Sequence, residues 1–416
     1  MEEWKEYKLG DVCTIVGRIG FRGYTTDDLT NNPKDGAITL SPTNIVQGEI
    51  DLSKPTYIKW PKYYESPEIM LNSGDIVLVK TGSSIGRTAY IRRIDHPMTL
   101  NPQFVVLKNI NINPIFLAYV VKTPHFQALL KTITVGSAIP TLSQKNLGNL
   151  KIHIPNKEYQ FKVASLLKSL DDKIDVNRRI NDNLEQQAQA LFKSWFVDFE
   201  PFKDQPFVES ELGMIPQGWV VKEAQDIFEI NIGKTPPRKE PEWFTESFVD
   251  NVWVSIADMG SCGVFISDSS EYLTDEAIKR FNVQMVEKNT VLLSFKLTVG
   301  RVAIAGTRLT TNEAIARFIL PNLCYREFLY LYLKQYKYGN LGSTSSIATA
   351  VNSKTIKGMK LLIPDLNVIQ YFSNNTRPLF EQIFIVQQES SRLAELRDTL
   401  LPRLMSGELS VNDIKE

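Results

Sequence analysis

The stretch VASLLKSLDDKIDVNRRINDNLEQQAQALFKSW, residues 163–195, decides how the rest of the chain is organised. Every third or fourth position in it is apolar except for two asparagines: Val163, Leu167, Leu170, Ile174, Asn177, Asn181, Leu184, Ala188, Leu191 and Trp195. This heptad spacing predicts one long helix with a seam buried against another helix. Neither glycine nor proline interrupts the stretch, and at ~1.5 Å per residue the helix is roughly 50 Å long. A helix of that length needs a partner of similar length.

A second seam of the same kind lies 209 residues further along the chain. It consists of Phe372, Thr376, Leu379, Ile383, Val386, Ser390, Leu393, Arg397, Leu400 and Leu404, with Leu396 as a possible substitute for Arg397. Similar segments precede the two helices, KIHIP at 151–155 and KLLIP at 360–364. One alternative is two unrelated surface helices, each packed on its own domain. The matched lengths and lead-in segments favour two helices packed on each other.

The length and composition are those of a globular protein with several domains. A chain of 416 residues with 43% apolar and 23% charged residues predicts two or three domains. No apolar run approaches the length of a membrane span, and the acidic N-terminus MEEW is unlike a signal peptide. The three scattered cysteines, Cys13, Cys262 and Cys324, are expected to be reduced thiols. Together these features predict a cytoplasmic protein.

The charge is balanced overall but unevenly distributed. Residues 1–155 carry 17 Lys and Arg against 13 Asp and Glu, a net of +4. Residues 206–364 carry 17 of each, and residues 365–416 carry 5 against 8, a net of −3. Such a distribution permits DNA binding through local basic patches. It also predicts a DNA site in which a partner neutralises much of the phosphate charge.

The second half of the chain repeats the first. At an offset of 214 residues, Val291–Leu293 matches Val77–Val79, and GRVAI at 300–304 matches GRTAY at 86–90. At an offset of 209, VNSKTI at 351–356 matches LSQKNL at 142–147. The pattern predicts an α+β fold with a two-fold internal repeat of globular domain and long helix. The predicted segments are 1–155 (first domain), 156–199 (central helix), 200–218 (linker, an irregular loop over Glu200–Pro216), 219–364 (second domain), 365–405 (C-terminal helix) and 406–416 (tail).

Polar loops differ most between the two repeats. Residues 17–32 correspond to residues 233–246, and residues 136–140 correspond to residues 342–349. A shared scaffold with different loops is what two related domains that recognise different targets would show. Ordinary drift after a duplication explains the same observation, so both interpretations stay open.

Three motifs suggest catalysis or metal binding, and none is complete. NPQF at 101–104 resembles the NPP-aromatic motif of amino-methyltransferases, but glutamine replaces the second proline and no Gly-rich donor-binding segment precedes it. We therefore expect a turn before a strand. GKT at 233–235 lacks the earlier glycine of a phosphate loop. The three histidines have no other ligand at metal-binding spacing. The sequence predicts no catalytic or metal site.

The order of domains and several motifs resemble the specificity subunits of type I restriction–modification systems. LFKSWFVDF at 191–199 and LRDTLLPRLMSGEL at 396–409 carry the resemblance most specifically. The segments GDIVL at 74–78 with SIGR at 84–87, and LSQKNL at 142–147 with the following Ile154-Pro155, are looser matches. Essentially the whole chain is covered.

The resemblance implies a non-catalytic subunit with two target recognition domains. Each domain would recognise one half of a bipartite, asymmetric site in double-stranded DNA. The helices would form an antiparallel coiled coil that spaces the domains and docks methylation subunits, of which we expect two, and a motor–nuclease subunit would join them for cleavage. S-adenosylmethionine, ATP and Mg²⁺ are expected on those partners and no cofactor on this chain. The absence of net positive charge in residues 206–364 departs from this picture.

The candidate DNA contacts are polar and basic residues in the loops. In the repeated turn they are Lys80, Thr81, Ser83, Ser84 and Arg87, with Lys296, Thr298 and Arg301 as counterparts. Near a predicted helix start they are Ser143, Gln144 and Lys145, with Asn352, Ser353 and Lys354 as counterparts. In the divergent loops Arg18, Arg22, Arg238 and Lys239 are candidates for contacts with bases. For each residue, solvated surface is the alternative.

Two further questions remain open at the level of sequence. Asn177 and Asn181 would favour one register of the helix pair if they are buried, whereas the alternative is that this part of the seam faces solvent. Besides the specificity subunit, a coiled-coil DNA-binding regulator and a scaffold without nucleic acid are the alternatives. The missing donor-binding motif excludes a free-standing methyltransferase.

Overall fold

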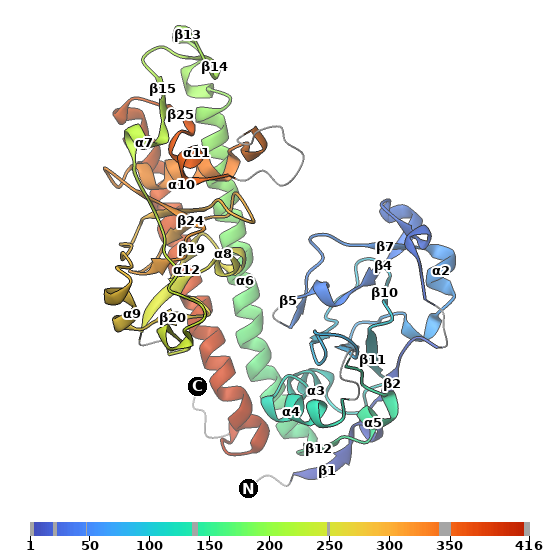
Figure 1. The fold of residues 1–416 in the computed structure, drawn as a ribbon. Coiled ribbons are helices and arrows are strands. Elements are labelled where there is room, and N and C mark those ends of the chain that lie inside the picture. Colours follow the sequence, from blue (N-terminus) through green and yellow to red (C-terminus); the bar gives the residue numbers. More distant parts are fainter. Residues whose placement is uncertain are drawn as a thin grey trace. The chain divides into compact units, whose positions relative to one another are not determined.

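The computed structural model describes residues 4–19, 23–46, 48–134, 140–247, 250–340 and 351–411. The chain divides into two compact units, Met1–Lys173 with Leu393–Glu416 (unit 1) and Ile174–Arg392 (unit 2). Two long helices, α6 (Lys157–Phe196) and α12 (Leu366–Ser406), each contribute one part to each unit (Figure 1).

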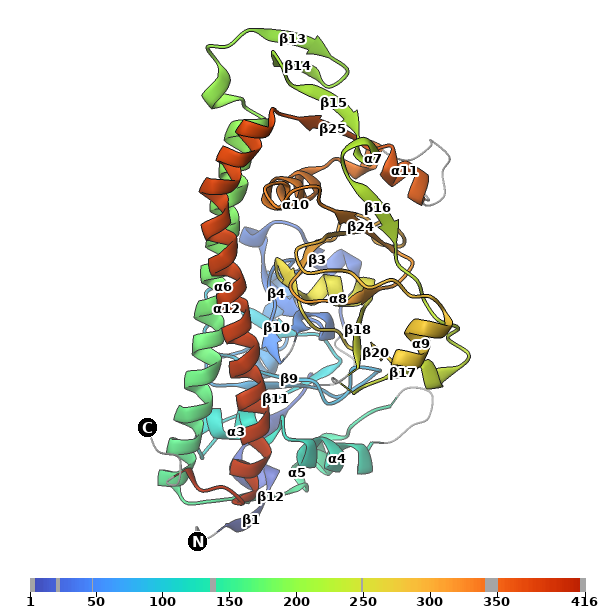
Figure 2. The same cartoon turned by 90° about the vertical axis from the view of Figure 1, so that its left-hand side faces the viewer.

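The two long helices run antiparallel within each unit (Figures 1 and 2). In unit 1 the Tyr159 hydroxyl lies 3.4 Å from the Leu404 carbonyl, and Asp171 binds Arg397. In unit 2 the Trp195 ring packs on Phe372. All ten predicted positions of both seams are buried or half-buried. This excludes two unrelated surface helices and confirms the predicted pair.

The seam contains polar residues that lie inside the helix pair. Arg397 keeps its own seam position, whereas Leu396 is 46% exposed, so the suggested substitution of Leu396 is wrong. In unit 2 Asn177 is fully buried, and its Nδ2 donates to Glu389 Oε2 at 2.7 Å. The alternative that the seam faces solvent here is therefore wrong for Asn177. A buried amide paired across the seam favours one register of the two helices.

Unit 1 contains two four-stranded sheets, of which the first packs toward its part of the helix pair and the second packs on the other face of the first. The first sheet is antiparallel, with the order β2 (Thr14–Val16), β11 (Phe104–Lys108), β8 (Ile76–Val79) and β9 (Thr88–Tyr90). The second has the order β10 (Met98–Leu100), β4 (Gly36–Leu40), β7 (Tyr57–Lys59) and β3 (Leu29–Thr30), with β10 parallel to β4. The smaller elements are β1 (Lys5–Lys8), which pairs with β12 (Lys151–Ile154), β5 (Ile45–Val46), β6 (Glu49–Ile50), α1 (Leu9–Val12), α2 (Trp60–Tyr64), α3 (Pro114–Val120), α4 (Pro124–Thr132) and α5 (Gln144–Gly148).

Alternation along β8 separates two of the apolar clusters in the core of unit 1. Ile76 and Leu78 belong to the cluster that contains α3, α4 and the long helices. Val77 and Val79 belong to the cluster between the two sheets. Successive side chains of a strand point to opposite faces, so one fully buried strand serves both clusters.

Unit 2 repeats this architecture. Its first sheet has the order β16 (Glu229–Ile232), β24 (Ile315–Ile319), β21 (Val291–Ser294), β22 (Val302–Ala305) and β19 (Phe265–Ile266). Its second has the order β17 (Phe244–Thr245), β20 (Tyr272–Leu273), β18 (Asn251–Val254) and β23 (Thr310–Thr311), with β18 parallel to β23. The remaining elements are β15 (Val220–Glu223), which pairs with β25 (Lys360–Ile363), α7 (Ala224–Ile227), α8 (Ile256–Ser261), α9 (Asp275–Arg280), α10 (Tyr325–Gln335) and α11 (Ser353–Lys357). The predicted α+β fold with two globular domains and an internal repeat is confirmed.

The structural offset between β8 and β21 differs by one residue from the predicted 214. Val77 pairs with Ala89, and Leu292 pairs with Ala303, so the two turns differ in length. Val77 faces the cluster between the sheets, whereas Val291 faces the helix-side cluster. Aligning β21 with β8 at an offset of 214 would therefore exchange the two faces of the strand, whereas an offset of 215 matches each face to its equivalent.

The segment before the second domain is not the irregular loop that was predicted for Glu200–Pro216. It contains a two-stranded hairpin, β13 (Phe207–Ser210) with β14 (Gly213–Pro216). Gly213, at φ +98°, adopts the left-handed conformation that closes the turn, and Ser210 Oγ donates to its carbonyl at 2.7 Å. Phe207 and Val208 are adjacent and are followed by Glu209 and Ser210, so β13 lacks the alternating pattern of a half-buried strand, and the glycine makes the hairpin possible.

Candidate nucleic-acid interface

Two groups of predicted DNA contacts lie side by side in unit 1. The Leu142 amide donates to the Lys80 carbonyl at 2.8 Å, and the Gly82 amide donates to the Pro140 carbonyl at 3.1 Å. Thr81 and Thr141 form an isolated bridge between the same segments. The turn after β8 and the start of α5 are therefore one surface, although they are distant in sequence. Ser83 is exposed on it, whereas Lys80, Thr81 and Ser84 are half-buried.

The predicted helix starts are capped by their own side chains. Ser143 Oγ accepts from the Asn146 amide at 3.0 Å, and Asn352 Oδ1 accepts from the Thr355 amide at 3.0 Å. These caps occupy donors that the sequence analysis assigned to phosphate. The exposed side chains next to the caps are Gln144, Lys145, Ser353 and Lys354. Contacts of these four residues with DNA stay a prediction.

The turn before β11 is confirmed, and its counterpart escaped the sequence analysis. Asn101 Oδ1 accepts from the Gln103 amide at 3.0 Å, and β11 begins at the next residue. In unit 2 Asn312 Oδ1 accepts from the Ala314 amide at 3.1 Å, directly before β24. The motif therefore makes the same Asx-type turn in both repeats. The asparagine that recurs three residues before the first residue of each strand was the signal.

The arginines of the divergent loops are bound by their own domains. Arg18 Nη2 donates to the Leu100 carbonyl at 3.1 Å, and burial lowers the pKa of its guanidinium. Arg238 makes a two-pronged pair with Glu271, 2.8 Å for each bond, and lies over the Phe244 ring at 4.1 Å. Arg238 must exchange Glu271 for any base that it contacts. Lys239 is exposed, and Arg22 lies outside the described residues.

The counterparts in unit 2 are arranged differently from those in unit 1. Lys296 and Thr298 are exposed on the turn after β21. Arg301 is half-buried, and its Nη1 donates to the Ile256 carbonyl at 2.5 Å. Among the described residues, no hydrogen bond joins this turn to the start of α11. In the part of the chain that the structure describes, hydrogen bonds join the two groups of predicted contacts in unit 1 only.

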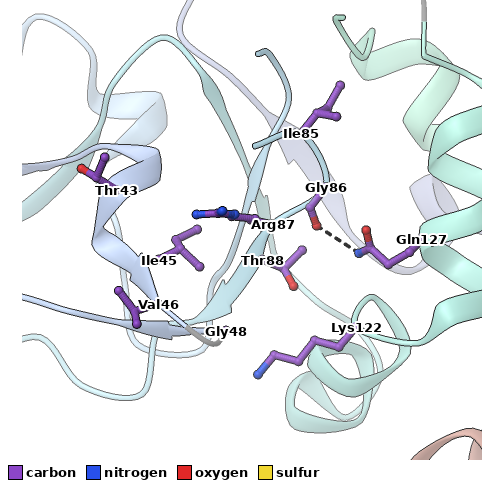
Figure 3. A pocket seen from close by; sticks show the side chains of 10 residues that line it. All are labelled: Thr43, Ile45, Val46, Gly48, Ile85, Gly86, Arg87, Thr88, Lys122 and Gln127. Atoms are coloured by element: carbon purple, nitrogen blue, oxygen red, sulfur yellow. Dashed lines mark hydrogen bonds between the residues drawn. The ribbon is translucent and has the colours of Figure 1, made fainter. Parts of the chain in front are cut away.

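An open groove of about 730 Å³ lies beside the turn of unit 1 (Figure 3). Arg87 enters it from the end of the turn, and Lys122 enters from the residues after α3. The lining residues are Thr43, Ile45, Val46, Gly48, Ile85, Gly86, Arg87, Thr88, Lys122 and Gln127. Of the side chains in the groove, Arg87 is a predicted DNA contact, whereas Lys122, Thr43 and Gln127 were not predictable because only the tertiary fold brings their segments to it.

Positive charge dominates the groove. The Arg87 side chain is exposed and makes no hydrogen bond or ion pair with any described residue. Lys122 Nζ lies 3.9 Å from Glu49 Oε1, which Arg92 also contacts at 3.2 Å. Burial lowers the pKa of Lys122, and the Glu49 carboxylate opposes that shift. The charged residues that line the groove, Arg87 and Lys122, are both cations, which suits the groove to binding an anion.

Other classes of site find no support in the residues that the structure describes. These residues contain no group of three or more histidine, cysteine, aspartate or glutamate side chains arranged to hold a metal ion. Within the same ranges, none of the helices has both the length and the apolar character needed to cross a membrane.

The chain is similar to known proteins along almost its whole length. The family model for the type I restriction modification DNA specificity domain matches residues 1–186 and 216–371. The type I restriction enzyme MjaIX specificity subunit of Methanocaldococcus jannaschii is 30% identical over 99% of this chain and 95% of its own. The type I restriction enzyme HindI specificity subunit of Haemophilus influenzae is 27% identical over 98% of this chain and all of its own.

A solved structure shows the same fold. The S subunit of a type I restriction–modification system from M. genitalium superposes with a TM-score of 0.54 at 14% identity, covering 97% of this chain and 96% of that one. Both repeats match the family model, and a relative that is 30% identical spans nearly the whole chain. The protein therefore belongs to the type I restriction modification DNA specificity family.

Proposed function

We propose that this chain recognises a bipartite, asymmetric sequence in double-stranded DNA, each domain recognising one half. The observation that carries the proposal is the match of the family model to both repeats, together with the same sheet, turn and capped helix in each unit. The loops that differ between the repeats, residues 17–32 and 233–246, are where different bases would be distinguished.

The long helices are proposed to space the two domains and to dock partner subunits. The relatives are named as specificity subunits of restriction enzymes, which supports assembly of this chain with methylation subunits, two by expectation, and with motor–nuclease subunits. S-adenosylmethionine, ATP and Mg²⁺ would be bound by those partners. The purified chain is therefore expected to have no methyltransferase, nuclease or ATPase activity. Robust methyl transfer by this chain without another polypeptide would contradict the proposal.

Methylome sequencing tests DNA recognition directly. Cells that lack other adenine methylation would carry the chain together with its methylation subunits, and one bipartite methylated sequence is expected. Exchanging residues 1–155 for the equivalent domain of a relative should change one half of that sequence and leave the other half unchanged. A change in both halves, or no specific methylation by the wild-type complex, would overturn the proposal.

A further inference from the structure

We propose that Arg87 in the groove of unit 1 binds one phosphate of the DNA backbone, with Lys122 adding positive charge to the same groove, and that the equivalent Arg301 of unit 2 makes no such contact. The inference rests on the proposed function, because that function makes DNA the source of the anion. The difference between Arg87 and Arg301 would make phosphate binding unequal in the two halves of the recognised site.

The backbone of Arg87 is fixed while its side chain is available. The Arg87 amide donates to the Ser84 carbonyl at 3.2 Å, and its carbonyl accepts from the Val79 amide at 2.9 Å. Gly86, at φ +87°, closes the turn immediately before it. The guanidinium therefore projects from a rigid turn into the groove with its donors unused by the described residues (Figure 3). Such a preorganised fork of N–H donors matches phosphate oxygens.

Lys122 supplies the second cation from the opposite wall. A Cβ atom placed on Gly48 would lie 3.1 Å from Lys122 Nζ, so the glycine leaves room for the ammonium group. Glu49 is the carboxylate facing this ammonium, at 3.9 Å, and Arg92 shares it. Arg92 also pairs with Asp172 at 2.9 Å and lies 4.0 Å from Asp171, so the positive charge available to an anion in the groove is chiefly that of Arg87. The Thr43 hydroxyl on the exposed rim lies 2.7 Å from Ser41 Oγ and is therefore already paired within its own turn.

The second unit uses the equivalent arginine as a structural group. Ser255 begins α8 in unit 2, where Ser41 begins a single turn, Pro42–Asn44, in unit 1. Arg301 donates to the carbonyl of Ile256, the first residue of α8, at 2.5 Å, and it lies against Gly260 on the added turn of that helix. A partner from its own domain therefore occupies Arg301, and the shorter turn of unit 1 leaves Arg87 without one.

The groove is suited to the backbone rather than to a base edge. Arg87 belongs to the Gly-Arg pair present in both repeats and not to a divergent loop, which indicates a contact independent of sequence. The walls include the apolar side chains of Ile45, Val46 and Ile85, and the Gln127 amide already donates to the Gly86 and Val121 carbonyls. Such walls pack against deoxyribose but lack the donor and acceptor pattern that distinguishes bases.

The salt dependence of DNA binding tests the contact. Arg87→Ala, Arg87→Lys and Arg301→Ala would be compared with wild type on a duplex that carries the methylated sequence, using the full chain with its methylation subunits. Loss of one phosphate contact should make the slope of log K against log salt shallower by about 0.9. The ratio of the wild-type affinity to the Arg87→Ala affinity should therefore fall about threefold when the salt concentration is raised from 50 to 200 mM. Arg87→Lys should keep the wild-type slope, and so should Arg301→Ala.

Single methylphosphonate linkages in the duplex locate the phosphate. Wild type should lose affinity at one linkage in the half recognised by residues 1–155, and Arg87→Ala should be insensitive at that linkage alone. An unchanged slope for Arg87→Ala, or equal slope changes for Arg87→Ala and Arg301→Ala, would overturn the inference. The proposed function would still stand in that case, provided that the wild-type complex binds the sequence specifically. Absence of specific binding by wild type would instead overturn the proposed function. Circular dichroism melting checks that each variant is folded.

Discussion

The carboxylate of Asp171 in α6 accepts a hydrogen bond from Arg397 of α12, with 2.7 Å between Oδ1 and Nη1. Its other oxygen accepts from the Tyr119 hydroxyl of α3 at 2.5 Å. One carboxylate, 9% exposed, thus joins both long helices and the domain of unit 1. The hydroxyl of Tyr330 in α10 similarly donates to Glu185 of α6 in unit 2, at 2.8 Å. In each unit a tyrosine joins its domain to a helix carboxylate.

Replacing Asp171 should destabilise unit 1. Asp171→Ala leaves Arg397 and the Tyr119 hydroxyl without their shared partner, at a cost of about 2–4 kcal/mol in the free energy of unfolding. The matched control is Asp398→Ala, which removes the other carboxylate bound to Arg397 but is 64% exposed. That change should cost less than about 1 kcal/mol. Denaturant unfolding measures both, and equal losses would show that Asp171 is an ordinary surface group.

Gly86 should resist substitution more strongly than Gly74. Both have a positive φ, +87° and +96°, which costs an alanine roughly 1–2 kcal/mol. A Cβ on Gly86 would also lie 2.6 Å from Gln127 Oε1, whereas a Cβ on Gly74 would meet nothing within 4 Å. Gly86→Ala should therefore lower the thermal unfolding midpoint further than Gly74→Ala does. Equal midpoints for the two variants would contradict the packing part of this explanation.

The cysteines should be unreactive in the folded protein. Burial raises the pKa of Cys13 to about 12 and that of Cys262 to about 11, and Cys324 is fully buried. At pH 8 a thiol with a pKa near 12 is thiolate in roughly one molecule per 10⁴, and only the thiolate attacks a disulfide reagent. Ellman's reagent should therefore label the three thiols rapidly only in denaturant. Rapid labelling of the native chain would contradict this.

The same shifts set the sign of a pH effect. Because the unfolded thiols ionise near pH 8.5 and the folded ones near 11 to 12, their contribution to stability is fully present below pH 8.5. It is lost as the pH rises toward 12. Cys13→Ala should unfold with a weaker pH dependence between pH 8.5 and 11, as followed by denaturant titration at each pH. An unchanged pH dependence would show that Cys13 is not responsible.

If the helices set the distance between half-sites, lengthening both should lengthen the gap. A four-residue insertion in α6 after Lys173, paired with one in α12 after Arg392, adds ~6 Å and turns each helix by about 400°. The seam then stays nearly in phase, and the gap should grow by one or two base pairs, at ~3.4 Å each, with both half-sequences unchanged.

The control is a pair of two-residue insertions at the same positions. These rotate the seam by about 200° and should prevent pairing of the helices. An insertion after Glu185 is less suitable, because Glu185 holds Tyr330. Methylome sequencing reads both results, and an unchanged gap in the four-residue variant would rule out the helices as the spacer.

The sequence by itself determined the two helices, their pairing and the repeat. Helical periodicity is local, so positions such as Leu167 and Ile383 identify a buried seam without any knowledge of the rest of the fold. The Ser143 cap was likewise predictable from its neighbours. The alignment of β8 with its equivalent β21 in the second repeat was not predictable. A shift of one residue in an apolar run leaves the sequence pattern intact while it exchanges the two faces of the strand.

Only the tertiary structure decided what the candidate site residues do. Arg87 and Arg301 occupy the same Gly-Arg pair and are indistinguishable in sequence. One projects into an open groove beside Lys122, and the other donates to the Ile256 carbonyl. The Ile256 carbonyl lies at the start of α8, and Gly260 on the added turn of this helix lies against the guanidinium, whereas the corresponding turn of unit 1 ends at Asn44. Side-chain partners depend on such distant packing, and local periodicity carries no information about it.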